Sequence, residues 1–176
     1  MQLFRAMLPT PLGDMLALSS DEGLCALEFT GPRKRLPKLE RRLTNWFPPH
    51  EIVDRDSPTI AATRAWLHAY FDGASADISA IPLDLRGAAF ERRVWKRLVR
   101  IPPGETTSYG AIAKALRAAG ASRAVGAANG ANPIAIVVPC HRVIGSTGSL
   151  TGYGGGLERK QWLLDHERRW KNGSLF

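Results

Sequence analysis

Residues 108–133 read SYGAIAKALRAAGASRAVGAANGANP, and this stretch decides the fold of the second half of the chain. Ser108 is placed to cap a helix that runs to about Arg117, with apolar residues at helical spacing. Gly120 marks a turn, and Ser122 can cap a second helix. Two short helices joined by a tight, Gly-containing turn form a helix-turn-helix pattern. Taken alone the pattern is weak, because many helical proteins contain such a corner.

The second of these helices, Arg123–Ala131, consists almost entirely of small side chains. Gly126 and Gly130 lower its helix propensity, and Asn132-Pro133 ends it. Small side chains let another surface approach the helix backbone closely. That surface is either a neighbouring helix or the narrow minor groove of a nucleic acid. Composition alone favours packing against a helix.

The rest of the second half is also predicted to be mostly helical. A helix is expected over about Phe90–Val99, where the apolar residues form one stripe, and Pro102-Pro103-Gly104 ends it. Ile134–Val138 is rich in β-branched residues and is predicted to be a short buried strand ending at Pro139.

The first half reads as a small α/β domain. Short apolar runs separated by glycine and proline predict strands at Met15–Leu18 and Leu24–Phe29. A short helix is expected at Lys38–Trp46. Ser57-Pro58 is a typical helix start, and helical spacing continues from there to Gly73.

Residues 74–87 are turn-like, and the domain boundary is placed within them. The sequence therefore predicts an α+β protein with two domains. Residues 1–85 form a small structural domain with an antiparallel sheet. Residues 86–176 form a mostly helical, winged-helix-like domain with the helix-turn-helix.

Bulk composition excludes several classes of protein. The chain has 176 residues, and no apolar run approaches the 18 or so needed to cross a membrane. Met1–Thr10 has no signal-peptide pattern. Two cysteines are too few for a disulfide framework or a zinc-thiolate domain, so we expect a cytoplasmic protein without a metal or other cofactor.

Charge is divided unevenly along the chain. Residues 1–85 hold nine Lys and Arg against eleven Asp and Glu, whereas residues 86–176 hold fifteen against five. The net charge of +8 therefore belongs to the second half. Such a basic half indicates either a polyanionic partner or simply a basic surface, and charge alone does not separate the two.

The two cysteines stand in different settings. Cys25 lies in an apolar strand with no basic neighbour, as buried inert cysteines do. Cys140 follows a rigid proline and precedes His141 and Arg142. An electropositive setting of this kind lowers a thiol pKa and favours the nucleophilic thiolate. A cysteine beside a histidine is also compatible with a thiol hydrolase.

The motifs of the second half, taken together, resemble the O6-alkylguanine-DNA alkyltransferase family. They match in content, order and spacing from about Phe90 to Glu167, whereas the first half resembles the family only in length, early strands and a late helix. The matching segments are Phe90–Trp95, Ile101–Gly110, Ser122–Val125, Asn132-Pro133, Pro139–Val143, Gly152-Tyr153 and Leu163–Glu167.

The resemblance implies four catalytic residues. Cys140 is the acceptor thiol, which attacks the alkyl carbon and ends as a stable thioether. His141 takes the thiol proton through a bridging water, and Glu167 orients that imidazole. Tyr109 donates a hydrogen bond near N3 of the departing guanine.

It also implies residues that bind the substrate base. Asn132 is the hinge between the recognition helix and the active-site loop, Val143 and Tyr153 belong to the pocket, and the N–H of Gly154 points at O6. Some relatives have Ser at the position of Gly154, so this chain lacks a hydroxyl there, which bears on the range of alkyl groups.

DNA contacts follow from the same resemblance. Arg123 is the finger that fills the place of a flipped-out nucleotide. The other expected DNA-binding residues are Ser122, Ala127, Ala128 and Arg142. The implied partner is double-stranded DNA with O6-alkylguanine, bound through its minor groove. The protein is expected to be a monomer, with clustering on DNA and activity on O4-alkylthymine left open.

Three other functions are weighed against direct repair. A module that recognises alkylated DNA without repairing it would lack the acceptor Cys140. A thiol hydrolase would leave the helix-turn-helix without a purpose. A transcriptional regulator of this family would carry an additional zinc-thiolate domain, for which the cysteines are missing.

Overall fold

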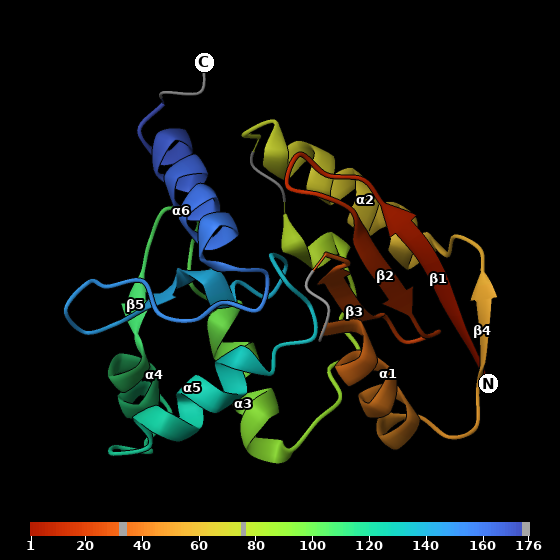
Figure 1. The fold of residues 1–176 in the computed structure, drawn as a ribbon, viewed down its shortest axis with the longest axis horizontal. Helices are drawn as coiled ribbons and strands as arrows, with labels where there is room; N and C mark the ends of the chain where they lie inside the picture. The colour runs from red at the N-terminus through yellow and green to blue at the C-terminus, as the bar shows by residue number, and fades with distance from the viewer. Residues whose placement is uncertain (32–34, 75–76, 174–176) are drawn as a thin grey trace. The chain divides into compact units, whose positions relative to one another are not determined.

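The computed structural model describes residues 1–31, 35–74 and 77–173 (Figure 1). The chain divides into two compact units, Met1–Arg86 and Gly87–Phe176. The expected boundary lay one residue earlier, and residues 75–76 of the expected linker lie outside the described part.

The first unit is built on a four-stranded sheet in the order β3-β2-β1-β4. Its strands are β1 (Gln2–Leu8), β2 (Met15–Ser19), β3 (Leu24–Phe29) and β4 (Glu51–Asp54). The first three pair antiparallel, as expected, but β4 pairs parallel with β1. Since helix α1 (Arg35–Trp46) connects β3 to β4, the chain re-enters the sheet in the direction of β1.

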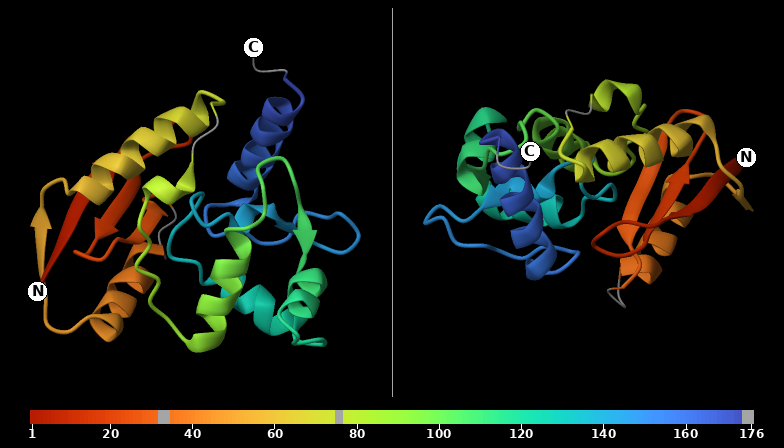
Figure 2. Two further views of the ribbon diagram at one scale, coloured as in Figure 1. Left: turned by 180° about the vertical axis from the view of Figure 1, so that it is seen from behind. Right: turned by 90° about the horizontal axis from the view of Figure 1, so that it is seen from above.

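Two helices cover opposite faces of this sheet (Figures 1 and 2). Helix α1 lies on one face, and α2 (Pro58–Phe71) lies on the other. The Ser57 hydroxyl caps α2 by accepting from Ile60 N at 3.1 Å, as its sequence predicts. Strand β3 is buried along its whole length, because both faces of the sheet are covered. A short 3₁₀ helix, η1 (Ile78–Ala80), follows.

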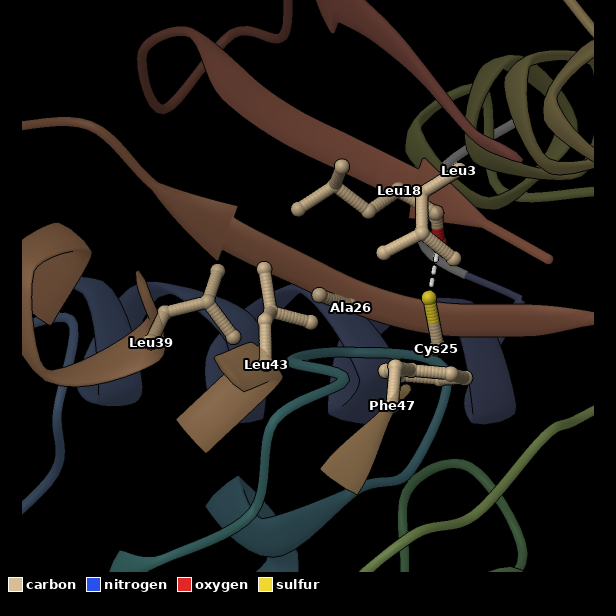
Figure 3. Packing of buried hydrophobic residues seen from close by; sticks show 7 residues of the cluster. All are labelled: Leu3, Leu18, Cys25, Ala26, Leu39, Leu43 and Phe47. Atoms are coloured by element: carbon tan, nitrogen blue, oxygen red, sulfur yellow. Dashed lines mark hydrogen bonds between the residues drawn. The ribbon is translucent and has the colours of Figure 1, made fainter. Parts of the chain in front are cut away.

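Cys25 belongs to the apolar core between the sheet and α1 (Figure 3). Its thiol donates to the Leu18 carbonyl at 3.3 Å. Burial raises the pKa of this thiol to about 12, so Cys25 is protonated and unreactive near neutral pH. The buried members of this cluster are Leu3, Leu18, Cys25, Ala26, Leu39, Leu43 and Phe47.

The second unit is mostly helical, and with the first it confirms the predicted α+β class. Its helices are α3 (Ala89–Leu98), α4 (Tyr109–Ala115), α5 (Ser122–Gly130) and α6 (Leu157–Lys171). Helices α4 and α5 form the helix-turn-helix, and Ser108 caps α4 by accepting from Ala111 N at 3.1 Å. In the described part of the chain, no helix has the length and apolarity that crossing a bilayer requires.

Ser122 does not cap α5. The helix starts one residue earlier than predicted, so Ser122 is its first residue, and Ala121 at the N-cap provides no side-chain hydrogen bond. The buried face of α5 packs on α3, where the indole N–H of Trp95 donates to the carbonyl of Ala128 at 2.8 Å.

The predicted strand at Ile134–Val138 is wrong, because Ile134 makes only an isolated bridge and residues 135–137 form a turn. The Asn132 side chain replaces a strand partner: its Oδ1 accepts from Ile134 N at 3.0 Å, and its Nδ2 donates to Val138 O at 2.7 Å. Ile136 has a φ of 68°, which β-branched residues rarely adopt. The residues are apolar because the whole turn is buried, and burial rather than pairing explains their β-branched character.

After this turn come the 3₁₀ helix η2 (Cys140–Arg142) and strand β6 (Val143–Ile144). Strand β6 pairs parallel with β5 (Thr107–Ser108), which leads directly into α4. This short ladder brings the segment after Cys140 beside the start of α4, where Tyr109 is located.

Candidate active site

Two asparagines hold the segment that presents Cys140. Asn132 closes the buried turn that precedes it. Asn129 of α5 donates from Nδ2 to the Cys140 carbonyl at 3.3 Å, so the helix-turn-helix is hydrogen-bonded directly to Cys140. The sequence analysis missed Asn129, although a polar residue within a run of Ala and Gly was a usable signal. Cys140 is 7% exposed.

His141 and Glu167 form a fully buried pair, with 2.7 Å between His Nε2 and Glu Oε1. An ionised carboxylate only accepts hydrogen bonds, so Nε2 carries the ring proton. Nδ1 then has a lone pair, and it is buried without a hydrogen-bond partner among the described residues. Burial lowers the pKa of His141, and this outweighs the opposing effect of Glu167. The ring is therefore a neutral base.

Several groups donate hydrogen bonds to the Glu167 carboxylate. Besides His141, Arg142 donates to it from Nε at 2.9 Å and Nη2 at 2.7 Å. The backbone N–H of Gly104 donates another at 3.1 Å. Burial alone would raise the pKa of Glu167, but His141 and Arg142 outweigh it and hold the pKa well below its usual range. Gly104 has a φ of 80°, and a Cβ there would lie 3.2 Å from the Glu167 carbonyl and 2.9 Å from Lys171.

The structure corrects two of the expected DNA contacts. Arg142 is 5% exposed and its guanidinium bonds inward, so it does not provide a surface charge for phosphates. Ala128 is 2% exposed, because it faces α3. The sequence analysis placed both residues on the surface. The charge of Arg142 does not show which way its side chain points, and the position of Ala128 in a helix of small residues does not show which face it lies on.

The remaining expected contacts of α5 do lie on the surface. Ser122, Arg123 and Ala127 are exposed. They share an accessible face whose side chains, Arg123 apart, are small.

A buried lysine lies close to Cys140. The ammonium of Lys160 in α6 donates to the carbonyls of Val143 at 2.6 Å and Thr151 at 3.2 Å, which joins the two ends of the intervening loop. Burial lowers the pKa of Lys160, and the charge of Cys140 opposes this shift. Lys160 therefore adds to the electropositive setting of Cys140. The sequence analysis did not single it out, because nothing local distinguishes it from a surface lysine of α6.

Tyr109 begins α4, and its hydroxyl is hydrogen-bonded to the Thr151 hydroxyl. Its ring lies against Gly126 of α5, where an added Cβ would be 3.7 Å from the ring. Tyr109 is half-buried, so it lies between the interior and the exposed helix-turn-helix.

The other residues expected to bind the base lie beside His141 or in the segments next to it. The Tyr153 ring stands edge-on to His141, with 6.5 Å between ring centroids. Val143 is buried in β6, and Gly154 is half-buried in the loop before α6. The structure thus brings Cys140, His141 and Glu167 close to the loop before α6. The sequence analysis expected these residues to lie in one site.

Comparison with known proteins matches both halves of the chain to one family. Residues 3–85 match the ribonuclease-like domain of 6-O-methylguanine DNA methyltransferase, and residues 89–169 match its DNA binding domain.

Individual relatives agree with this match. A methylated-DNA–protein-cysteine methyltransferase of Salmonella typhimurium is 44% identical over 169 residues, which covers 95% of this chain and 96% of the relative. One of Mycolicibacterium paratuberculosis is 64% identical over 109 residues, but the aligned part spans 62% of this chain and only 66% of that protein's length.

Solved structures give the same answer. A Mycobacterium tuberculosis O6-methylguanine methyltransferase has a TM-score of 0.76 at 40% identity, covering 94% of this chain and 93% of that one. A Mycobacterium tuberculosis structure in complex with DNA has a TM-score of 0.75 at 40% identity, covering 100% and 99%. The chain belongs to the 6-O-methylguanine DNA methyltransferase family.

Proposed function

We propose that this protein repairs DNA by moving the alkyl group of O6-alkylguanine to the sulfur of Cys140. The observation that carries the proposal is the buried His141–Glu167 pair, in which His141 comes directly after Cys140. The imidazole Nε2–H is held by Glu167, and Nδ1 is a buried acceptor in the residue next to Cys140. The family membership supports the choice of alkylated DNA as substrate.

The reaction is a single displacement. His141 Nδ1 takes the thiol proton of Cys140 through a bridging water, and Glu167 stabilises the resulting imidazolium. The thiolate attacks the alkyl carbon, so a C–S bond forms while the bond between that carbon and O6 breaks. The electron pair of the broken bond stays on the guanine. The guanine takes up one proton in place of the alkyl group, which balances the proton that Cys140 gave to His141. This chemistry needs a thiol, a base with its orienting carboxylate and a water molecule, so we propose no cofactor.

Tyr109 is suited to assist the leaving group. Its hydroxyl can exchange the Thr151 partner for N3 of the guanine, and a hydrogen bond there strengthens as negative charge develops on the ring. We place the base between Tyr153 and Val143, with the Gly154 N–H directed at O6.

We propose that DNA binds to the exposed face of α5 through its minor groove. O6 of guanine is enclosed in the duplex, so the nucleotide has to be flipped out, which takes a few kcal/mol. The small side chains of α5 permit close approach to the groove. Lys and Arg of the basic half contribute affinity through phosphates without reading sequence, as a scanner for damage requires.

The acceptor has to be a thiol, so we place the reaction in a reducing compartment such as the cytosol. We propose that the protein acts as a monomer.

Titration against excess duplex carrying one O6-methylguanine is expected to stop at one methyl group per protein. A thioether offers water no leaving group, so the acceptor is not regenerated. Mass spectrometry of the digested protein should find the methyl group on the Cys140 peptide. A Cys25→Ala variant is the matched control and should reach the same plateau, because the Cys25 thiol is buried and protonated. Turnover beyond one equivalent would support a hydrolase instead.

Arg123→Ala is expected to slow repair in duplex DNA by about tenfold or more, because holding a base out takes a few kcal/mol and about 1.4 kcal/mol is a factor of ten. Attack on free O6-benzylguanine should be nearly unchanged, since that substrate needs no flipping. Single-turnover rates on the two substrates provide the comparison. Equal loss on both would assign Arg123 to the fold or to the active site.

A further inference from the structure

Arg142 is buried beside the proposed catalytic pair and has no role in the transfer described above. Its Nε and Nη2 donate to the two oxygens of Glu167, and its Nη1 donates to the Ile101 carbonyl at 2.5 Å. The side chain of Arg142 is 6% exposed and that of Glu167 is fully buried. The ion pair is thus formed away from bulk water.

We propose that Arg142 is a positioning residue that keeps His141 neutral, by providing the counter-charge that Glu167 would otherwise draw from the imidazole. This inference rests on the proposed alkyl transfer, because it concerns the proton acceptor of that reaction.

The reason is charge balance in a buried site. A buried carboxylate needs a positive partner, and leaving it uncompensated is strongly destabilising. A guanidinium supplies a fixed positive charge, so beside Arg142 the Glu167 carboxylate requires only a hydrogen bond from His141. Without the guanidinium, the negative charge of Glu167 would be balanced by protonation of its other neighbour, His141. An imidazolium has no lone pair at Nδ1 and could not accept the thiol proton.

Few charged groups lie near enough to His141 to affect its protonation. In the described part of the chain, the charged groups acting on it are Glu167 and Lys160 from α6 and Arg142 from η2. Glu167 raises its pKa, whereas burial, Arg142 and Lys160 lower it. The Tyr153 ring packs against it from the loop before α6, and Cys140 precedes it in η2. Helix α3 also packs against η2, and its buried residues are Val94, Trp95 and Leu98.

Geometry gives Arg142 a second task that lysine could not perform. Its planar fork reaches both carboxylate oxygens, so Oε1 is turned to His141 and Oε2 to the Gly104 N–H. A lysine ammonium would keep the charge but would not fix the rotation of the carboxylate. The two tasks can therefore be separated by substitution.

The first test measures methyl transfer from O6-methylguanine duplex in single-turnover experiments as a function of pH. In Arg142→Met, the acid limb of the rate profile should move to higher pH by about one unit or more, because a nearby positive charge that disfavours the imidazolium is removed. Below the limb the rate should then fall about tenfold relative to the unmodified protein. Arg142→Lys should keep the limb near its original position, with a lower rate at all pH values.

The second test needs no substrate. The His141 imidazole is titrated by NMR in the unmodified protein and in Arg142→Met, and its signal is identified by its loss in His141→Gln. We expect His141 to titrate at higher pH in Arg142→Met. If the unmodified protein transfers no methyl group, the proposed function fails while this titration still decides the role of Arg142.

A folded Arg142→Met protein with unchanged His141 titration and only a lower melting temperature would overturn the proposal, because Arg142 would then be structural. If Arg142→Met does not fold, the double variant Arg142→Met/Glu167→Gln is tested instead of the single variant, because it removes both charges of the ion pair. Its acid limb should lie at or below the original position, because the carboxylate charge that would protonate His141 is gone. An upward displacement in the double variant would overturn the proposal as well.

Discussion

Replacing Glu167 by Gln is expected to slow alkyl transfer by about 10³- to 10⁴-fold, which is the scale seen when the buried carboxylate of a Ser-His-Asp triad becomes an amide. The amide cannot satisfy both neighbours. If its oxygen faces the Arg142 donors, its NH₂ group faces His141 and forces the ring proton to Nδ1. The imidazole then presents a donor where the thiol proton has to be accepted.

The same substitution should also destabilise the protein. Breaking a buried ion pair at one partner typically costs about 3–5 kcal/mol, and Arg142 would remain buried without its carboxylate. Single-turnover rates and thermal melts measure the two effects. Glu158→Gln, at an exposed position of the same helix, is the matched control and should change neither. A folded Glu167→Gln protein that transfers at a rate close to the original would remove Glu167 from the proton path.

Tyr109→Phe is expected to slow transfer by about a hundredfold, the usual loss when one donor to a developing negative charge is removed. Affinity for undamaged DNA should stay nearly constant, because this hydrogen bond belongs to the transition state. Single-turnover rates and a DNA-binding titration measure the two quantities.

Thr151→Val is the matched control for this prediction. It keeps the tyrosine hydroxyl and removes the group to which that hydroxyl is bonded. We expect a transfer rate within a few-fold of the original, since the partner has to be exchanged for the base in any case. If Tyr109→Phe melts at a lower temperature while its rate is unchanged, the hydroxyl serves only to hold the loop to α4.

The comparison of sequence and structure differs between the two units. In the first, strands β2 and β3 and helix α2 were readable, because alternation, glycines and a Ser-Pro start are local signals. Strands β1 and β4 were missed. Residues Glu51–Asp54 are mostly exposed and form an edge, and their parallel pairing with β1 depends on the path of α1.

In the second unit, two sequence-based predictions were wrong because the residues concerned are buried. The residues of Ile134–Val138 carry the composition of a strand, but the side chain of Asn132 folds them into a turn. Arg142 stands next to His141 in the sequence and has the charge of a phosphate contact, but its partner Glu167 is 25 residues further along and completely buried. No local pattern reports a partner at that distance.

Motifs and composition alone indicated the family, the helix-turn-helix, Cys140 as the proposed acceptor and the concentration of positive charge in the second half, because these features depend only on the order and spacing of residues. The tertiary structure decided which way each polar group faces. It turned Arg142 and Ala128 inward, left Arg123 outside, and joined Asn129 to the carbonyl of Cys140. Burial and hydrogen-bond geometry, which set the protonation state of His141, arise only when elements distant in the chain pack together.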